Sequence, residues 1–196
     1  LYKNKKLIES KRKIFHKKDV FTSKKSPHVK IKGKDVIKGQ IDKKTGNWIY
    51  DLYYKINDTI FDLKFEGKGN GYKGSVGMPY NKKGNTKQGK WAVILPFADV
   101  KGIIKLKDKI INVKGQGYHD HNWDMRGTVI TNHGWLWGKI FTKKHAIVWA
   151  KVFNTKDISS NILIISKKNN EFQSFKSKEI NLVADDYKKI KNRLIP

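Results

Sequence analysis

Short β-prone runs separated by turn residues recur along almost the whole chain from residue 26 onward. They are rich in Ile, Val, Trp, Tyr and Phe, and many alternate apolar with polar side chains, as half-buried strands do. The clearest runs cover residues 28–32, 36–41, 48–56, 59–66, 90–96, 98–106, 109–117, 135–141, 145–153, 161–166 and 171–175. Such a series of short strands predicts an all-β fold, either an antiparallel β-barrel or a strongly curved sandwich.

The turns between these runs are tight. Asn57-Asp58 and Lys107-Asp108 each predict a hairpin with a two-residue loop. Consecutive hairpins favour an up-and-down, lipocalin-like sheet, and about eight such strands enclose a cavity for one small ligand. Residues 67–89 hold seven Gly and are predicted to form a long loop or lid. Short helices are expected only near the termini, within residues 1–20 and 185–193.

A chain of 196 residues is long enough for one domain with a substantial core. We expect a basic N-terminal tail or short helix over residues 1–20. A lipocalin-like β domain is expected over residues 21–196, which would hold either one β unit or one unit and part of a second. The absence of Cys excludes disulfides and Cys-based sites. The chain does not begin with Met and shows no signal-peptide pattern, so we expect a trimmed N-terminus and infer no compartment.

The net charge of +26 comes mainly from Lys, because only three of the 43 basic residues are Arg. Arg is favoured in base and phosphate recognition, since its planar fork forms paired hydrogen bonds. The Lys residues are also spread through every segment. We therefore expect no specific nucleic-acid partner, and at most a weak attraction to anionic membrane surfaces. The oligomeric state is left open.

Chemically active side chains are concentrated in Gly115–Trp123. If this stretch is extended, Tyr118, Asp120 and Asn122 share one face. Burial among aromatic rings would favour the protonated form of Asp120, which could then act as a general acid. Aromatic ring faces attract a carbocation, and the candidates for this role are Trp91, Trp123, Trp135 and Trp137.

The opposite face of the same stretch carries His119, His121 and Trp123. A His-x-His pair on a strand places two imidazoles together, a geometry that zinc or iron accepts. The third ligand would have to be His133, His145 or a carboxylate, and no spacing identifies one. We favour a structural or supporting role for the two His, and predict neither a metal nor a cofactor. A polar strand end with a buried Trp remains a third interpretation of the whole stretch.

The segment Gly117-Tyr118-His119-Asp120-His121-Asn122-Trp123 resembles the Gly-Tyr-x-Asp-His-Asn-Trp-Gly signature of the carotenoid 1,2-hydratase (hydroxyneurosporene synthase) and AttH-like family. Residues 91–96 are similar to the family's Trp-x-Val-x-x-Pro segment, and residues 135–138 to its Trp-x-Trp-Gly. Asp124 stands where the signature has Gly. The order and rough spacing of these segments match over about residues 25–155.

The resemblance implies a lipocalin-like fold and cofactor-independent chemistry on a hydrophobic, isoprenoid-like substrate. The reaction would be an acid-catalysed hydration, isomerisation or cyclisation, as in a hydro-lyase. Asp120 is then the expected proton donor, with Tyr118 orienting the substrate. Trp91, Trp123, Trp135 and Trp137 would bind the substrate, and the supporting residues would be His119, His121 and Asn122. The alternative is a non-catalytic carrier of a hydrophobic ligand in the same cavity.

Overall fold

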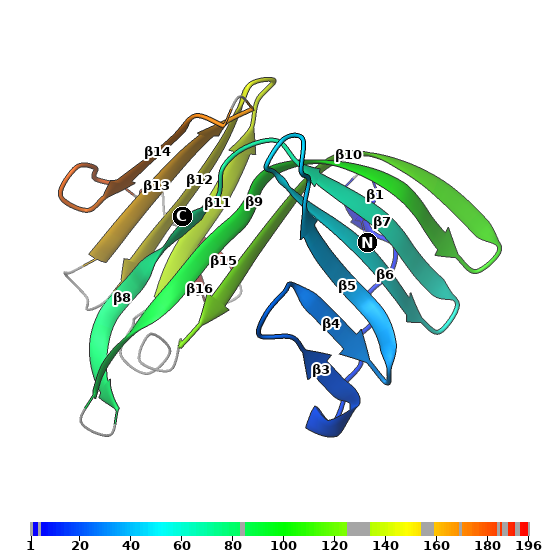
Figure 1. Cartoon of the computed structure of the whole chain (residues 1–196). Coiled ribbons are helices and arrows are strands. Elements are labelled where there is room, and N and C mark those ends of the chain that lie inside the picture. Colours follow the sequence, from blue (N-terminus) through cyan, green and yellow to red (C-terminus); the bar gives the residue numbers. More distant parts are fainter. Residues whose placement is uncertain are drawn as a thin grey trace. The chain divides into compact units, whose positions relative to one another are not determined.

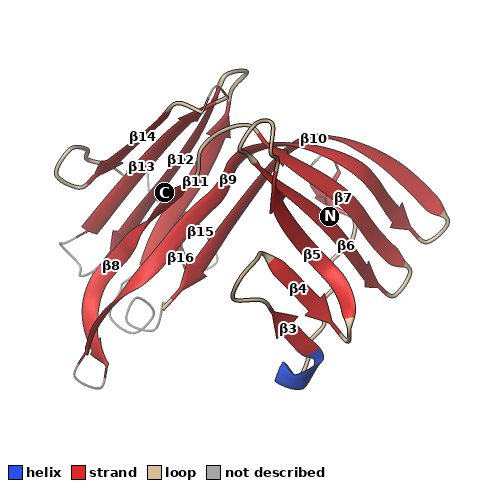
Figure 2. Cartoon of the chain, viewed as in Figure 1, coloured by secondary structure: helices blue, strands red, loops and turns tan. Residues whose placement is uncertain are grey.

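The structure of the chain is a computed structural model that is built almost wholly of antiparallel strands (Figure 2). Its one helical element is a 3-10 turn at Lys17–Asp19, among the residues that the structure describes. The backbone is described for residues 2–3, 5–82, 85–124, 134–153, 159–168, 170–183, 185, 188–190 and 193–195. No helix within these ranges is long and apolar enough to cross a membrane.

The strands, labelled in Figure 1, are β1 (Tyr2–Lys3), β2 (Lys6–Leu7), β3 (Val20–Thr22), β4 (His28–Ile31), β5 (Lys34–Ile41), β6 (Trp48–Ile56), β7 (Thr59–Gly67), β8 (Tyr72–Lys82), β9 (Asn85–Leu106), β10 (Lys109–Trp123), β11 (Gly134–Phe141), β12 (His145–Phe153), β13 (Ser159–Lys167), β14 (Phe172–Lys176), β15 (Lys188–Ile190) and β16 (Arg193–Ile195). They confirm the predicted all-β class. Among the described residues the sheets are antiparallel and are not closed into a barrel.

The chain divides into two compact units, and β9 and β10 each contribute to both. Unit 1 comprises Leu1–Lys68 and Ala98–Tyr118. Its strands pair in the order β10-β9-β7-β6-β5-β4-β3, which is an antiparallel meander. The pair Ile56↔Thr59 closes the predicted two-residue turn, where Asn57 has a φ of 52°. Asn tolerates this left-handed conformation, which suits a hairpin turn.

Unit 2 comprises Gly69–Phe97 and His119–Pro196. One layer is the sheet β11-β12-β13-β14, and the other is formed by β8 with the neighbouring part of β9. The layers meet through the Phe97 and Phe141 rings, 5.4 Å apart, and through the Tyr72 and Phe172 rings, 6.4 Å apart. β12 has a strict alternation of buried and half-buried residues, so one face of its sheet forms the core.

The loop predicted for residues 67–89 from their high glycine content is wrong. β8 and the start of β9 form a hairpin there. A Cβ at Gly74 would lie 1.9 Å from the Tyr72 hydroxyl, and one at Gly71 would lie 2.5 Å from the Val93 carbonyl oxygen. These glycines therefore permit close approach within a sheet.

The helix expected near the C-terminus is also wrong, whereas residues 1–20 hold a 3-10 turn at Lys17–Asp19. At the C-terminal end, β15 and β16 pair with each other in place of a helix over residues 185–193. The segment is short for a stable helix, and its one Ile, Ile190, favours a strand. Near the N-terminus, Leu7, Ile8 and Ile14 are exposed, so their spacing does not define a core-facing helical stripe.

Candidate functional site

Trp91 and Asp120 meet in unit 2. Trp91 lies on β9 and is only 3 % exposed, so its indole N–H needs a partner inside the protein. The Trp91 Nε1 atom donates a hydrogen bond to Asp120 Oδ2 over 2.9 Å. Asp120 lies near the end of β10 and is half-buried. The carboxyl group is therefore held in a fixed position by a buried aromatic side chain.

Two further tryptophans share a face of the β11–β12 pair. Residues directly opposite one another in an antiparallel pair lie on the same face. Trp135, Trp137 and Lys139 of β11 stand opposite three buried residues of β12: Val152, Ala150 and Val148. Trp135 is nevertheless 62 % exposed and Trp137 is 42 % exposed. The edge strand thus presents two large aromatic rings to solvent on the core-forming side of its sheet.

Lys139 connects this aromatic face with Asp120. Partial burial of the Lys139 ammonium removes water from it and lowers its pKa, although the residue as a whole is exposed. The negative charge of Asp120 opposes this shift and raises the same pKa. The two side chains therefore interact electrostatically, which makes Lys139 part of the group around Asp120.

His119, His121 and Trp123, on the other face of the Gly115–Trp123 stretch, have interactions of their own. Burial lowers the pKa of His119, with a raising effect of Asp120 and a lowering effect of His121. A lowered pKa leaves the His119 imidazole neutral near pH 7. The rings of His121 and Trp123 stack with centroids 5.5 Å apart, and the Lys73 ammonium lies 5.8 Å from the Trp123 ring centroid. These contacts agree with a supporting role.

A metal at His119 and His121 finds no third ligand within the described ranges. No group of three or more His, Asp or Glu side chains there could hold an ion. His133, one of the suggested ligands, lies outside the residues that the structure describes.

The roles expected for Tyr118 and Asn122 stay predictions. Tyr118 belongs to unit 1 and is half-buried, whereas Asn122 is exposed at the end of β10. The first residue of the signature, Gly117, has a packing role in unit 1. A Cβ there would lie 2.4 Å from Val100 Cγ2 and 2.7 Å from the Phe65 ring.

Sequence reasoning missed Lys139 and Tyr72. Lys139 could have been found from the alternation Trp135-x-Trp137-x-Lys139, which places all three on one face of a strand. The Tyr72 hydroxyl is buried and has no hydrogen-bond partner in the part of the chain that the structure describes. Its ring lies 6.4 Å from the Trp91 ring in an edge-to-face arrangement. No sequence pattern indicates this unpaired hydroxyl.

The apolar cavity expected around Asp120 stays a prediction. A surface hollow of about 610 Å³ is lined by Ser75, Ser160, Asn161, Ile162, Lys176, Ser177, Lys178 and Glu179. This lining is mostly polar and includes neither Asp120 nor Trp91. The exposed aromatic face of β11 is a separate apolar surface of unit 2.

Fold and site together define an all-β protein in which a buried indole hydrogen-bonds to a carboxylate, in a unit that also carries an exposed aromatic strand face. No family model matches the chain, and neither a curated protein nor a solved structure does so. Its function has to be argued from its own residues.

Proposed function

We propose that unit 2 binds a hydrophobic, isoprenoid-like small molecule against the Trp135 and Trp137 rings. Asp120 and Lys139 would hold the polar end of this ligand. The observation that carries the proposal is the position of the two rings, which lie on the core-forming face of their sheet yet remain largely exposed. An apolar surface of this kind is stabilised when it is covered.

The polar groups beside the rings suit a ligand with a hydroxyl or a similar head group. Asp120 accepts hydrogen bonds and Lys139 donates them, so together they can bind a group that does both. Trp91 fixes the carboxyl orientation through its indole N–H. The resemblance of residues 117–123 to the carotenoid hydratase signature supports an isoprenoid over other apolar ligands.

Binding can be tested with farnesol as the probe, by quenching of tryptophan fluorescence and by native mass spectrometry. The double variant Trp135→Ala/Trp137→Ala is expected to bind farnesol at least about tenfold more weakly. The reason is that farnesol loses the apolar contact area that the two indole rings provide. Trp48→Ala, a half-buried tryptophan of unit 1, is the matched control and should bind normally. Equal affinity of the double variant and the control would contradict the proposal.

A second candidate is hydration of the bound molecule, favoured by the half-buried carboxyl of Asp120 held beside the Trp91 ring. Asp120, once it has taken up a proton, would give this proton to a C=C bond, and a water would add to the carbocation. That water would return a proton to the carboxylate, so the protein ends unchanged. Aromatic ring faces nearby would stabilise the cation.

The two candidates separate experimentally. An isoprenoid with a terminal C=C bond is incubated with the protein in ¹⁸O-labelled water, and labelled alcohol is measured by mass spectrometry. Asp120→Asn should abolish product formation while retaining farnesol binding. If the unchanged protein yields no labelled alcohol, hydration is excluded and the binding proposal stands on its own test.

A further inference from the structure

The sheet of unit 1 splits between β5 and β6. These strands pair as far as Ile37↔Leu52. Beyond this point β5 continues to Lys34 while paired with β4, and β6 continues to Ile56 while paired with β7. The two strands therefore separate between the start of β5 and the end of β6 (Figure 1).

A hollow of about 450 Å³ lies where the strands separate, and its volume is within the range of about 300–1,000 Å³ that is usual for small-ligand sites. Its lining combines basic and aromatic side chains from the N-terminal segment, β5 and β6. The residues are Lys13, Phe15, Ile31, Lys32, Lys34, Asp35, Val36, Tyr53, Tyr54, Lys55 and Asn57.

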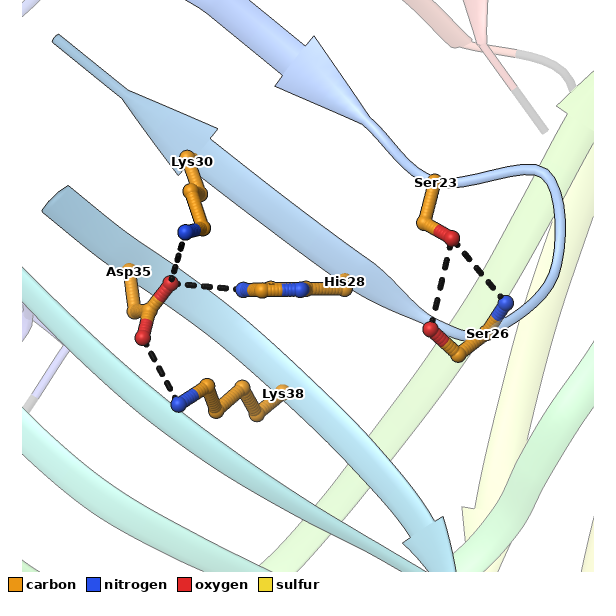
Figure 3. A network of polar contacts seen from close by, with 6 residues as sticks. All are labelled: Ser23, Ser26, His28, Lys30, Asp35 and Lys38. Atoms are coloured by element: carbon orange, nitrogen blue, oxygen red, sulfur yellow. Dashed lines mark hydrogen bonds and ion pairs between the residues drawn. The ribbon is translucent and has the colours of Figure 1, made fainter. Parts of the chain in front are cut away.

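The charge of this hollow is positive, because four Lys and a single acidic residue, Asp35, line it. Asp35 is already neutralised by basic groups (Figure 3). Its carboxylate contacts Lys38 Nζ at 2.7 Å, His28 Nε2 at 2.6 Å and Lys30 Nζ at 3.7 Å. The Lys38 and His28 hydrogen bonds lower the pKa of Asp35 to about 2, so it stays ionised and paired. The four lining Lys are left to attract an anion.

Aromatic rings are interleaved with these lysines. Tyr53 is 47 % exposed, although it is a large side chain on a central strand. Tyr54 and Phe15 also line the hollow, and the Lys13 ammonium lies 5.6 Å from the Phe15 ring centroid. Planar rings between cations suit a ligand that is both planar and negatively charged.

A second hollow of about 530 Å³ adjoins the first, because Lys13 and Tyr54 line both. It adds Arg12 and the Phe61 ring to the same pattern. Its one acidic residue, Glu9, lies 3.3 Å from Lys11 and is thus also paired. The two hollows, which share Lys13 and Tyr54, are together called the basic and aromatic track of unit 1.

We propose that this track binds single-stranded nucleic acid without sequence preference. Single-stranded nucleic acid offers a chain of phosphates for the lysines and unpaired bases for stacking on Tyr53 and its neighbours. Sequence-independent binding needs no paired hydrogen bonds to base edges, so it is compatible with the scarcity of Arg. An anionic membrane or polysaccharide would match the charge, but neither offers planar rings to stack on exposed tyrosine.

The test uses the full chain and a fluorescein-labelled dT12 oligonucleotide, followed by anisotropy at several salt concentrations. Tyr53→Ala should weaken binding about tenfold, since loss of one stacked base costs that order of affinity. Tyr53→Phe keeps the ring and should bind normally. Lys34→Gln/Lys55→Gln should reduce the slope of log affinity against log salt by about 1.4, because about 0.7 is lost per released phosphate contact.

The matched control is Lys43→Gln/Lys44→Gln, which removes the same charge from the exposed turn after β5, outside both hollows. It should retain most of the affinity and slope. The proposal is overturned if this control loses as much affinity as Lys34→Gln/Lys55→Gln, or if Tyr53→Ala binds normally. It is also overturned if a duplex of the same length binds as tightly, or if only phosphatidylserine vesicles bind through these residues. Circular dichroism of each variant checks that the strands are retained.

Discussion

The Tyr72 hydroxyl is the clearest single-residue anomaly in unit 2. It lies in the core beside Trp91, and its oxygen has no hydrogen-bond partner among the described residues. The Trp91 indole N–H donates its hydrogen bond to Asp120, so it does not donate one to the Tyr72 hydroxyl. Burial also raises the pKa of Tyr72, because the charged phenolate would be poorly solvated.

Removal of this hydroxyl should stabilise the protein. A buried polar group without a partner costs about 1–3 kcal/mol, so Tyr72→Phe is expected to raise the free energy of unfolding by about 1 kcal/mol. The ring contacts with Trp91 and Phe172 are kept. Urea denaturation followed by tryptophan fluorescence measures the change, with Tyr53→Phe at an exposed position as the control. A loss of stability in Tyr72→Phe would show that the hydroxyl has a partner.

At the scale of the element, β10 combines a packing role and a chemical role on one strand. Gly117 gives room for Val100 and the Phe65 ring in unit 1, while Asp120 accepts the Trp91 hydrogen bond in unit 2. Two residues of the signature, three positions apart, therefore serve different units. Part of the signature is explained by packing, without reference to chemistry.

This division predicts a sharp contrast between two glycines of β10. Gly117→Ala introduces a Cβ about 2.4 Å from Val100 Cγ2 and should destabilise unit 1 by about 1–3 kcal/mol, as overpacking does. Gly115→Ala meets nothing within 4 Å and should be neutral or slightly stabilising. Thermal and urea unfolding of both variants makes the comparison. Similar losses in the two variants would refute the packing explanation.

Strands with strong alternation could be predicted from the sequence almost to the residue. β6 and β12 have their predicted bounds, since branched and aromatic residues with period two leave no helical alternative. The β8 hairpin was missed because Gly71 and Gly74 have the composition of a loop, and their close contacts are visible only in the structure. A single sequence cannot show which glycine is required by a neighbour.

The candidate site was predictable in part. The chemical density of residues 117–123 pointed to Asp120, and Trp91 was one of four tryptophans expected to bind the substrate. The hydrogen bond between Trp91 and Asp120 was not predicted. Lys139 was not predicted, because its proximity depends on how β11 meets the rest of unit 2. Whether Asp120 donates a proton stays a prediction.

At the scale of the whole molecule, buried tyrosines occur in both units and link stability to alkaline pH. Burial raises the pKa of Tyr50 in unit 1 to about 12 and also raises the pKa of Tyr72 in unit 2. The folded state thus favours the neutral phenol. Its stabilising contribution is complete below the unfolded pKa of about 10 and is lost as pH rises toward the folded pKa.

The unfolding free energy should therefore fall between about pH 10 and pH 12, where unfolded tyrosine ionises first. Lysine side chains also lose their protons over this pH interval. The unchanged protein is therefore compared with the variant Tyr50→Phe/Tyr72→Phe, which keeps all the lysines. The unchanged protein should lose more stability over this interval than the double variant. Urea unfolding at a series of pH values measures the difference, and parallel curves would contradict the assignment.

The pairing order of the strands has a kinetic consequence. In unit 1 most strands pair with the next strand along the chain, and β11 to β14 do the same in unit 2. Each such hairpin closes a short loop, so little chain entropy is lost before the first contacts form. β7 and β9 are separated by β8, but β8 pairs with β9 and shortens that path as well. We therefore expect refolding in the millisecond range rather than over seconds, faster than for a β-sandwich whose strands cross between sheets.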